Sequence, residues 1–261
     1  MRHIWVLNGK TLKYYALATV AALFAASFLY ASQAYIPAFS TDEGPRAFHR
    51  AEIDEKKAAL TFNISWGDKR ALPILEILAD HKVEEATFFV SASWAERHPD
   101  ILEKINEAGY TIGNHGYQYE HYTEWEESEM MRDLNESHRK LKEVGGIEPV
   151  YFRPPHGDFD ERVLQAVDRF GYSTIHWSVG GSDWKNPGVE TIVKDITENT
   201  EPGDVILLHA SDSAKQTHKA LPVILNDLSE KGYQLVSLEE LITDGEAKTQ
   251  ENKVIKNSHF P

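Results

Sequence analysis

Residues 58–68 read AALTFNISWGD, and this stretch decides the fold. Its first seven positions hold five apolar side chains, and polar residues follow at Ser65 and Asp68. Such a pattern is typical of a buried strand that presents polar groups at its C-terminal end. In α/β proteins, binding and catalytic residues gather where parallel strands end. The stretch therefore predicts a buried strand with a functional site just beyond it.

Strand and helix patterns alternate along the rest of the chain. Strands are expected at 86–90, 110–113, 150–152, 173–179, 204–209 and 233–237, and helices at 71–81, 95–107, 126–144, 161–170, 189–199 and 217–231. This alternation implies parallel strands joined by right-handed crossovers, and about seven strand–helix pairs are enough to close a barrel. We predict an α/β fold, a distorted (β/α)7-type barrel, over residues 58–242. Residues 36–57 form a linker leading into this domain, and 243–261 form a polar tail that we expect to be disordered.

The first 35 residues predict a membrane anchor. Arg2, Lys10 and Lys13 precede an uncharged run at 14–35 that is long enough to cross a bilayer. We expect an uncleaved transmembrane helix that holds the domain on the extracytoplasmic side, in the cell or spore envelope. Residues 32–34 (SQA) leave open the alternative of a cleaved signal peptide and a secreted protein.

Composition narrows the class of ligand. The chain has 261 residues, with 27 Lys and Arg against 41 Asp and Glu, and a formal net charge of -14. Nucleic-acid binding requires clustered cations, so no nucleic-acid partner is expected. The chain has no cysteine, which excludes disulfides and thiolate metal sites. A transition metal would have to be held by His, Asp and Glu.

Polar and aromatic residues follow the predicted strands where a barrel places its site. Imidazole, carboxylate and guanidinium groups are those of metal-assisted or acid–base hydrolysis, and a tryptophan can stack on a sugar ring. For the histidine at 209 and the aspartate at 183, a purely structural pair is the alternative. The residues at these positions are Asn63, Trp66, Asp68, His115, His121, Arg153, His156, Asp183, Trp184 and His209.

Five motifs resemble those of the polysaccharide deacetylase superfamily, also called NodB-homology or carbohydrate esterase family 4. The motifs are ALTFN at 59–63, GNHGY at 113–117, RPPHG at 153–157, WSV at 177–179 with DW at 183–184, and LLHA at 207–210. The resemblance is closest to the sporulation-associated PdaB-type branch and runs from the N-terminal anchor to about residue 242. It implies a hydrolase that removes N-acetyl groups from the aminosugars of peptidoglycan or chitin-like polymers, here in sporulation.

The resemblance also assigns roles to individual residues. His209 would be the general acid, and Asp183 would hydrogen-bond to it and stabilise its charge. Arg153 would orient the general base, whose position is occupied here by Asn63, an amide without useful basicity. The backbone near His156 would help to hold the oxyanion. Trp184, His156 and Trp66 would contact the sugar.

The family's divalent metal, zinc or cobalt, is expected at three positions of this chain. These are Ile64, His115 and Tyr119, of which only His115 can be a ligand. Asp68 and His121 are possible replacement ligands.

Two functions remain open. One is a polysaccharide deacetylase acting on cell-wall or spore-cortex glycan, with weak activity or an unusual metal arrangement. The other is a catalytically inactive relative that binds glycan or a protein partner. In both cases the N-terminal helix would attach the protein to the membrane.

Overall fold

The computed structural model describes residues 19, 40–41 and 44–249. Contacts divide the chain into residues 1–37 and 38–261, and the strands and helices given below all belong to the second unit. The predicted membrane span at 14–35 lies outside the described residues, apart from position 19. Within the described residues, no helix combines the length and hydropathy needed to cross a membrane.

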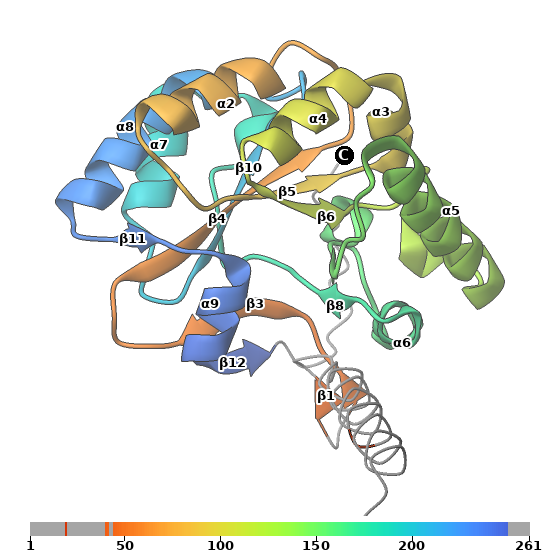
Figure 1. Ribbon diagram of the computed structural model, residues 1–261. Coiled ribbons are helices and arrows are strands. Elements are labelled where there is room, and N and C mark those ends of the chain that lie inside the picture. The colour runs from red at the N-terminus through yellow and green to blue at the C-terminus, as the bar shows by residue number, and fades with distance from the viewer. Residues whose placement is uncertain (1–18, 20–39, 42–43, 250–261) are drawn as a thin grey trace, which may run out of the picture. The chain divides into compact units, whose positions relative to one another are not determined.

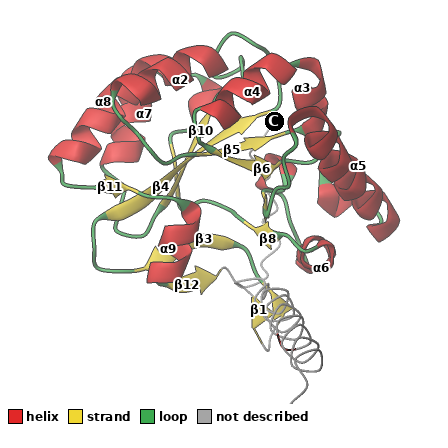
Figure 2. Ribbon diagram, in the orientation of Figure 1, coloured by secondary structure: helices red, strands yellow, loops and turns green. Residues whose placement is uncertain are grey.

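A curled sheet of parallel strands forms the centre of the domain, as the sequence predicts (Figures 1 and 2). Its strands follow the order β8-β7-β6-β5-β4-β10-β9, and β11 pairs with the beginning of β4. These strands are β4 (Lys57–Ile64), β5 (Thr87–Val90), β6 (Thr111–Asn114), β7 (Tyr151–Phe152), β8 (Ser173–Thr174), β9 (Val179–Gly180), β10 (Val205–His209) and β11 (Gln234–Leu235).

Helices cover the outer face of the sheet, with α2, α4, α7 and α8 packed over its central strands (Figure 1). The helices are α2 (Ala71–Asp80), α3 (Ala92–Arg97), α4 (Pro99–Glu107), α5 (Glu127–Gly145), α6 (Glu161–Phe170), α7 (Val189–Thr197), α8 (Thr217–Glu230) and α9 (Leu238–Asp244). The short strands are β1 (Ser40–Thr41), β2 (Gly44–Pro45), β3 (Phe48–Glu52) and β12 (Glu246–Thr249).

Two predicted elements are interrupted. The helix expected at 95–107 is divided into α3 and α4 at His98, because Pro99 has no N–H and disfavours helical backbone in the residue before it. The strand expected at 173–179 is divided into β8 and β9, which lie at opposite ends of the strand order. The sheet is curled but does not close into a barrel by strand pairing. β8 and β9 follow each other in the sequence, and they are not paired with each other in the sheet.

β3 fills the gap between those two ends. Phe48 forms a parallel bridge with Ile175, just after β8, and Arg50 forms an antiparallel bridge with Asp204, just before β10. The Nε atom of Arg50 also lies 2.5 Å from a carboxylate oxygen of Asp204. On its other side β3 pairs with β12, at the start of the predicted tail. The interior of the curled sheet is thus closed by a strand that the sequence pattern does not predict.

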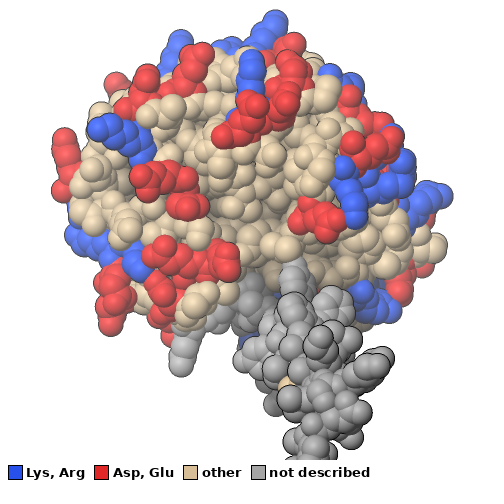
Figure 3. Space-filling model, viewed as in Figure 1, with Lys and Arg blue, Asp and Glu red and all other residues tan. Residues whose placement is uncertain are grey.

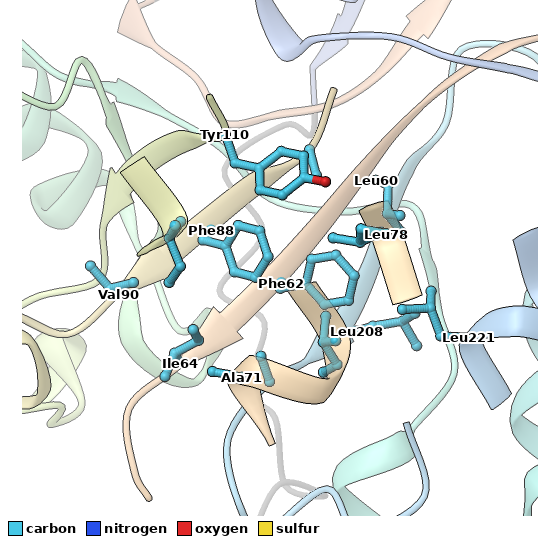
Figure 4. Packing of buried hydrophobic residues seen from close by; sticks show 14 of the residues in the cluster. Leu60, Phe62, Ile64, Ala71, Leu78, Phe88, Val90, Tyr110, Leu208 and Leu221 are labelled. Atoms are coloured by element: carbon cyan, nitrogen blue, oxygen red, sulfur yellow. The ribbon is translucent and has the colours of Figure 1, made fainter. Parts of the chain in front are cut away.

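Alternation along β4 separates the two faces of the sheet. Leu60, Phe62 and Ile64 belong to the hydrophobic cluster under the helices, where Phe62 stacks on Phe88 at 4.9 Å between ring centroids. Figure 4 shows Ile64 in this cluster, at the end of β4 and near Val90. Thr61 and Asn63 alternate with these apolar residues and face the interior of the curled sheet.

Charged side chains of both signs are interspersed on the face shown in Figure 3. On α5, for example, Arg139 forms ion pairs with Glu136 and Glu143. Exposed pairs of this kind contribute little to stability, because water and salt screen the attraction between their charges. On this face, basic side chains therefore lie beside acidic ones although the net charge of the chain is -14.

Candidate functional site

A cavity of about 330 Å³ lies where β4 and β10 end. Asn63 and His209 are register partners at the C-terminal ends of these two parallel strands, so both side chains reach the same edge of the sheet. The functional edge predicted from the sequence therefore coincides with a cavity. Its lining consists of Asn63, Ser65, Tyr119, His156, Trp177, Gly180, Ser182, Asp183, Trp184, Leu207, His209, Ser211 and Ser213.

His209 is held by Asp183 on one wall of the cavity. Asp183 Oδ1 lies 2.8 Å from His209 Nδ1, and its Oδ2 accepts hydrogen bonds from the His209 backbone N–H and the Thr217 hydroxyl, at 2.7 and 2.6 Å. A carboxylate can only accept, so Nδ1 carries a proton and the Nε2 atom is the one available to a ligand. This arrangement suits a proton donor to a bound group, and it also suits a simple binding contact.

Arg153 lies beneath the cavity and is completely buried. Its guanidinium donates to Thr61 Oγ1 and Asn63 Oδ1, both at 3.0 Å, and to the backbone carbonyls of Ile175 and His176. It also lies over the ring of Phe89, at 4.0 Å from the centroid. All of these partners are neutral. Burial lowers the pKa of Arg153, since nothing among its partners supplies the negative charge that a buried cation requires.

The bond to Arg153 fixes the orientation of Asn63. A guanidinium only donates, so the amide oxygen of Asn63 must face Arg153. The amide NH2 group is therefore the part of Asn63 that is available to a ligand in the cavity. A carboxylate here would offer an acceptor and a base, whereas Asn63 offers a donor.

The three predicted metal positions do not form a metal site. Ile64 is fully buried hydrocarbon in the cluster on the outer face of the sheet. The ring of Tyr119 packs edge-on against that of His115, with centroids 5.1 Å apart. His115 is itself fully buried, with Nδ1 2.6 Å from the Arg153 carbonyl. Its Nε2 atom has no hydrogen-bond partner within the described part of the chain. Burial lowers the pKa of His115 to about 3, so it is neutral.

The loop that carries Tyr119 is held firmly in place. Asp133 on α5 accepts hydrogen bonds from the backbone N–H groups of Tyr117 and Gln118, at 2.8 and 3.0 Å, and from the Tyr122 hydroxyl at 2.6 Å. Tyr119 has a left-handed backbone, with φ of 61°, and its side chain hydrogen-bonds to Ser65. These contacts keep the phenol ring over His115.

The predicted replacement ligands do not meet at His115. Asp68 is exposed, and its backbone N–H points to Asp212 at 3.3 Å. The ring of His121 stacks on that of His156 at 4.2 Å, and its Nδ1 lies 3.1 Å from an Asp158 oxygen. No group of three metal-ligating side chains occurs within residues 40–41 and 44–249. The residues present therefore do not fit the family's divalent metal.

The predicted sugar contacts fall into two groups. Trp184 and His156 line the cavity, and burial lowers the pKa of His156, with a further contribution from His121. Trp66 does not line the cavity, and 64% of its surface is exposed. It directly follows Ser65, which does line the cavity, so only its backbone is placed beside the cavity.

Sequence reasoning noted Ser65 only as a polar residue after the first strand, and selected no serine of the lining as a site residue. Ser211 and Ser213 follow His209 by two and four residues, and Ser65 follows Asn63 by two. The same rule that selected the histidine, a polar residue just after a strand, would have found them. Ser182 has a left-handed backbone, with φ of 47°, which the sequence does not signal.

Comparison with known proteins identifies the family to which these motifs belong. The polysaccharide deacetylase family matches residues 50–175. A peptidoglycan-N-acetylglucosamine deacetylase from Bacillus cereus is 33% identical over 192 residues, which cover 72% of this chain and 89% of that protein. The match therefore covers more than two thirds of this chain and most of that relative.

Solved structures with the same fold include two that bear on the site. A CE4 family pseudoenzyme from Bacillus anthracis has a TM-score of 0.71 and 30% identity, and the match covers 76% of this chain and 69% of that chain. PdaA from Bacillus subtilis, a family 4 carbohydrate esterase, has a TM-score of 0.70 and 28% identity, with 76% and 86% covered. The chain belongs to the polysaccharide deacetylase family, carbohydrate esterase family 4.

Proposed function

We propose that this protein binds aminosugar glycan of the cell wall in the cavity at β4 and β10, without the metal-dependent deacetylation of its relatives. One observation carries the proposal: the three metal positions hold a core isoleucine, a covered histidine and the tyrosine that covers it. A single neutral imidazole does not hold zinc or cobalt. The general-base position also holds an amide, Asn63, whose oxygen is engaged by Arg153.

Binding is supported by the lining that remains. Trp177 and Trp184 supply aromatic surface, and His209 and Asn63 supply polar contacts. Shallow cavities with aromatic walls and a few oriented polar groups suit sugar rings, whose faces are apolar and whose edges carry hydroxyls. The names of the relatives point to peptidoglycan as the source of such a sugar.

The place of action is part of the same proposal. The basic residues and apolar run at 2–35 support an N-terminal membrane helix with the domain on the extracytoplasmic side, and secretion after cleavage is the alternative. The motif resemblance to the PdaB-type branch supports a role in sporulation, with spore-cortex glycan as ligand.

A second function is weak hydrolysis, favoured by the intact pairing of His209 with Asp183. The two functions are separated by three measurements on the full-length chain in mild detergent. We would measure bound zinc or cobalt after incubation and desalting, acetate released from N-acetylglucosamine oligosaccharides, and binding of the same oligosaccharides by calorimetry. Binding without retained metal or acetate is expected. About one metal per chain, lost in His115→Ala, or acetate release that disappears in His209→Ala, would overturn the proposal.

A further inference from the structure

Basic side chains without acidic partners gather at the edge of the sheet where α2 and α8 begin. We call them the basic cluster, and its members are Lys69, Arg70, Lys215, His218 and Lys219. Arg139 on α5 and Lys194 on α7 form ion pairs with acids on their own helices. Among the described residues, no acid forms an ion pair with any member of the basic cluster. Its charge is therefore open to a ligand.

Two segments far apart in the sequence make up the basic cluster. β4 and β10 are parallel neighbours, so the helices that follow them, α2 and α8, begin at the same edge and lie side by side (Figure 1). Asp212, just before α8, accepts hydrogen bonds from the backbone N–H groups of Lys69 and Arg70, at 2.9 and 3.0 Å. Burial lowers the pKa of His218, and the charges of Arg70 and Lys219 lower it further. The two segments thus act on one ring.

The positive charges lie where helices disfavour them. The N-terminus of a helix carries a partial positive charge, so acidic side chains stabilise it and cations do not. The helices α4, α5, α6 and α7 each have an acidic residue in the first turn, whereas α2 and α8 have none. Instead Lys69 and Arg70 directly precede α2, and Lys219 lies in the first turn of α8. The field of two helix ends therefore adds to that of the basic cluster.

Hydrogen-bonding groups of the basic cluster are also unused. The Arg70 guanidinium makes no hydrogen bond to any residue that the structure describes, and its Nε atom is shielded from solvent. The Nδ1 atom of His218 is likewise shielded and has no partner in that part of the chain. Polar atoms in this state are costly, and an acceptor supplied by a ligand would offset the cost. An anionic acceptor would offset the repulsion between the cations as well.

The acids in the same two segments do not neutralise the basic cluster. Asp212 directs its carboxylate oxygens to the backbone N–H groups of residues 68–70. Asp68 is exposed, and it forms no ion pair within residues 44–249. These two carboxylates are outnumbered by the four Lys and Arg side chains, in a chain whose net charge is -14. Such a local excess of positive charge indicates an anionic ligand.

We infer that the basic cluster binds a phosphate group. A phosphate presents several oxygens and up to two charges, so it can accept from a guanidinium and from ammonium groups at the same time. A carboxylate presents two oxygens and one charge. No member of the basic cluster lines the cavity at β4 and β10, so this inference does not depend on the proposed glycan binding.

Inorganic phosphate tests the inference on the full-length chain in an uncharged detergent. Phosphate replaces chloride at constant pH and ionic strength, so that general screening is controlled. The backbone amide signals and the His218 ring signals are followed by NMR. We expect saturable shifts at residues 68–71 and 214–220. Shifts that do not saturate, or that spread over the whole domain, would overturn the inference.

Paired substitutions locate the binding. Lys69→Gln combined with Lys219→Gln should weaken phosphate binding about tenfold, because two nearby charges are removed. Lys82→Gln combined with Lys104→Gln is the matched control, which removes the same charge after the end of α2 and in the last turn of α4. All four lysines are exposed, so both variants should fold, which circular dichroism checks. Equal affinities in the two variants would overturn the inference.

Two further probes identify the source of the phosphate group. A soluble oligomer of glycerol phosphate and detergent micelles that contain phosphatidylglycerol are compared with inorganic phosphate in the same NMR titration. Tighter binding of the oligomer would support the site with a phosphate polymer as ligand, and tighter binding of the micelles would support it with a lipid headgroup. N-acetylglucosamine oligosaccharides carry no phosphate and should leave these signals unchanged. If they compete with phosphate, the two sites are not separate and the inference fails, while glycan binding stands.

Discussion

The Nε2 atom of His115 has no hydrogen-bond partner among the residues that the structure describes, and the ring of Tyr119 packs edge-on against this histidine. A buried polar atom without a partner is costly, and burial lowers the pKa of His115 to about 3. The histidine is therefore held as a neutral ring that does not take up a proton near pH 7. Its neutrality has a measurable effect on stability.

Acid should destabilise the protein through His115 and His176, whose pKa values burial lowers to about 3. The unfolded chain protonates both rings below about pH 6.5, whereas the folded chain does not. Above about pH 6.5 both states hold the rings neutral, so the free energy of unfolding is not reduced by them. As the pH falls from 6.5 toward 3, proton uptake by the unfolded chain lowers the free energy of unfolding. We expect a loss of about 2 kcal/mol per ring between pH 7 and pH 5, measured by urea unfolding.

The matched variant is His176→Phe, which removes one titrating ring and should reduce that loss by about half. Equal free energies of unfolding at pH 7 and pH 5 for the unaltered protein would contradict the burial of these two neutral rings.

Ile64→Asp should destabilise the protein without creating a metal site. Its side chain would place a carboxylate among the apolar residues under the helices, at a cost of about 3 kcal/mol. Ile64→Val is the control and should cost about 1 kcal/mol. Both are measured by urea unfolding with and without zinc. Stabilisation of the aspartate variant by zinc would show that position 64 can reach the site.

Asp183→Ala should be strongly destabilising, because three donors lose their acceptor at once. The His209 backbone N–H and the Thr217 hydroxyl would be left without their partner, for a loss of about 3 kcal/mol. Thr217→Val removes only one of the three bonds and should cost about 1 kcal/mol. Thermal unfolding of both variants gives the comparison. Similar losses of stability in the two would show that the other two hydrogen bonds to Asp183 contribute little.

Trp66→Ala should weaken glycan binding without affecting the fold. The indole is 64% exposed, so its removal should change the free energy of unfolding by less than about 0.5 kcal/mol. Loss of this exposed aromatic surface, one residue beyond the lining residue Ser65, should lower the affinity for long oligosaccharides about fivefold. Val223→Ala, another exposed apolar residue, is the control. Unchanged affinity would remove Trp66 from the binding surface.

The sequence was sufficient to predict the parallel strands and the edge where Asn63 and His209 meet. Both follow from local information: a buried strand reads as an apolar run, and parallel strands end on the same side. The pairing of His209 with Asp183 was also predicted, because each follows a strand in a motif of the family. The assignment of the three metal positions rests on the resemblance of the same motifs and stays a prediction.

The direction of side chains in loops could not be predicted. Gly67 has φ of 83°, and a Cβ there would lie 2.2 Å from the Asp212 side chain. This turn directs the backbone N–H of Asp68 to Asp212, and the Asp68 side chain is exposed. His121 is likewise held by Asp158, a partner 37 residues away. Such long-range contacts decide the site and leave no periodic pattern in the sequence.

β3 also defines what can be removed from this protein. Phe48 and Ala51 are fully or almost fully buried in the cluster inside the curled sheet, and the Ala51 N–H donates to the Gly203 carbonyl at 2.9 Å. A fragment that began at Lys57 would keep every strand of the parallel sheet but would expose apolar side chains of the cluster that Phe48 and Ala51 now cover. The bridge between Phe48 and Ile175 would be lost. Solvent would then reach Arg153, whose Nε donates to the Ile175 carbonyl. The shortest form suitable for crystallisation or for display on a surface therefore begins before residue 48.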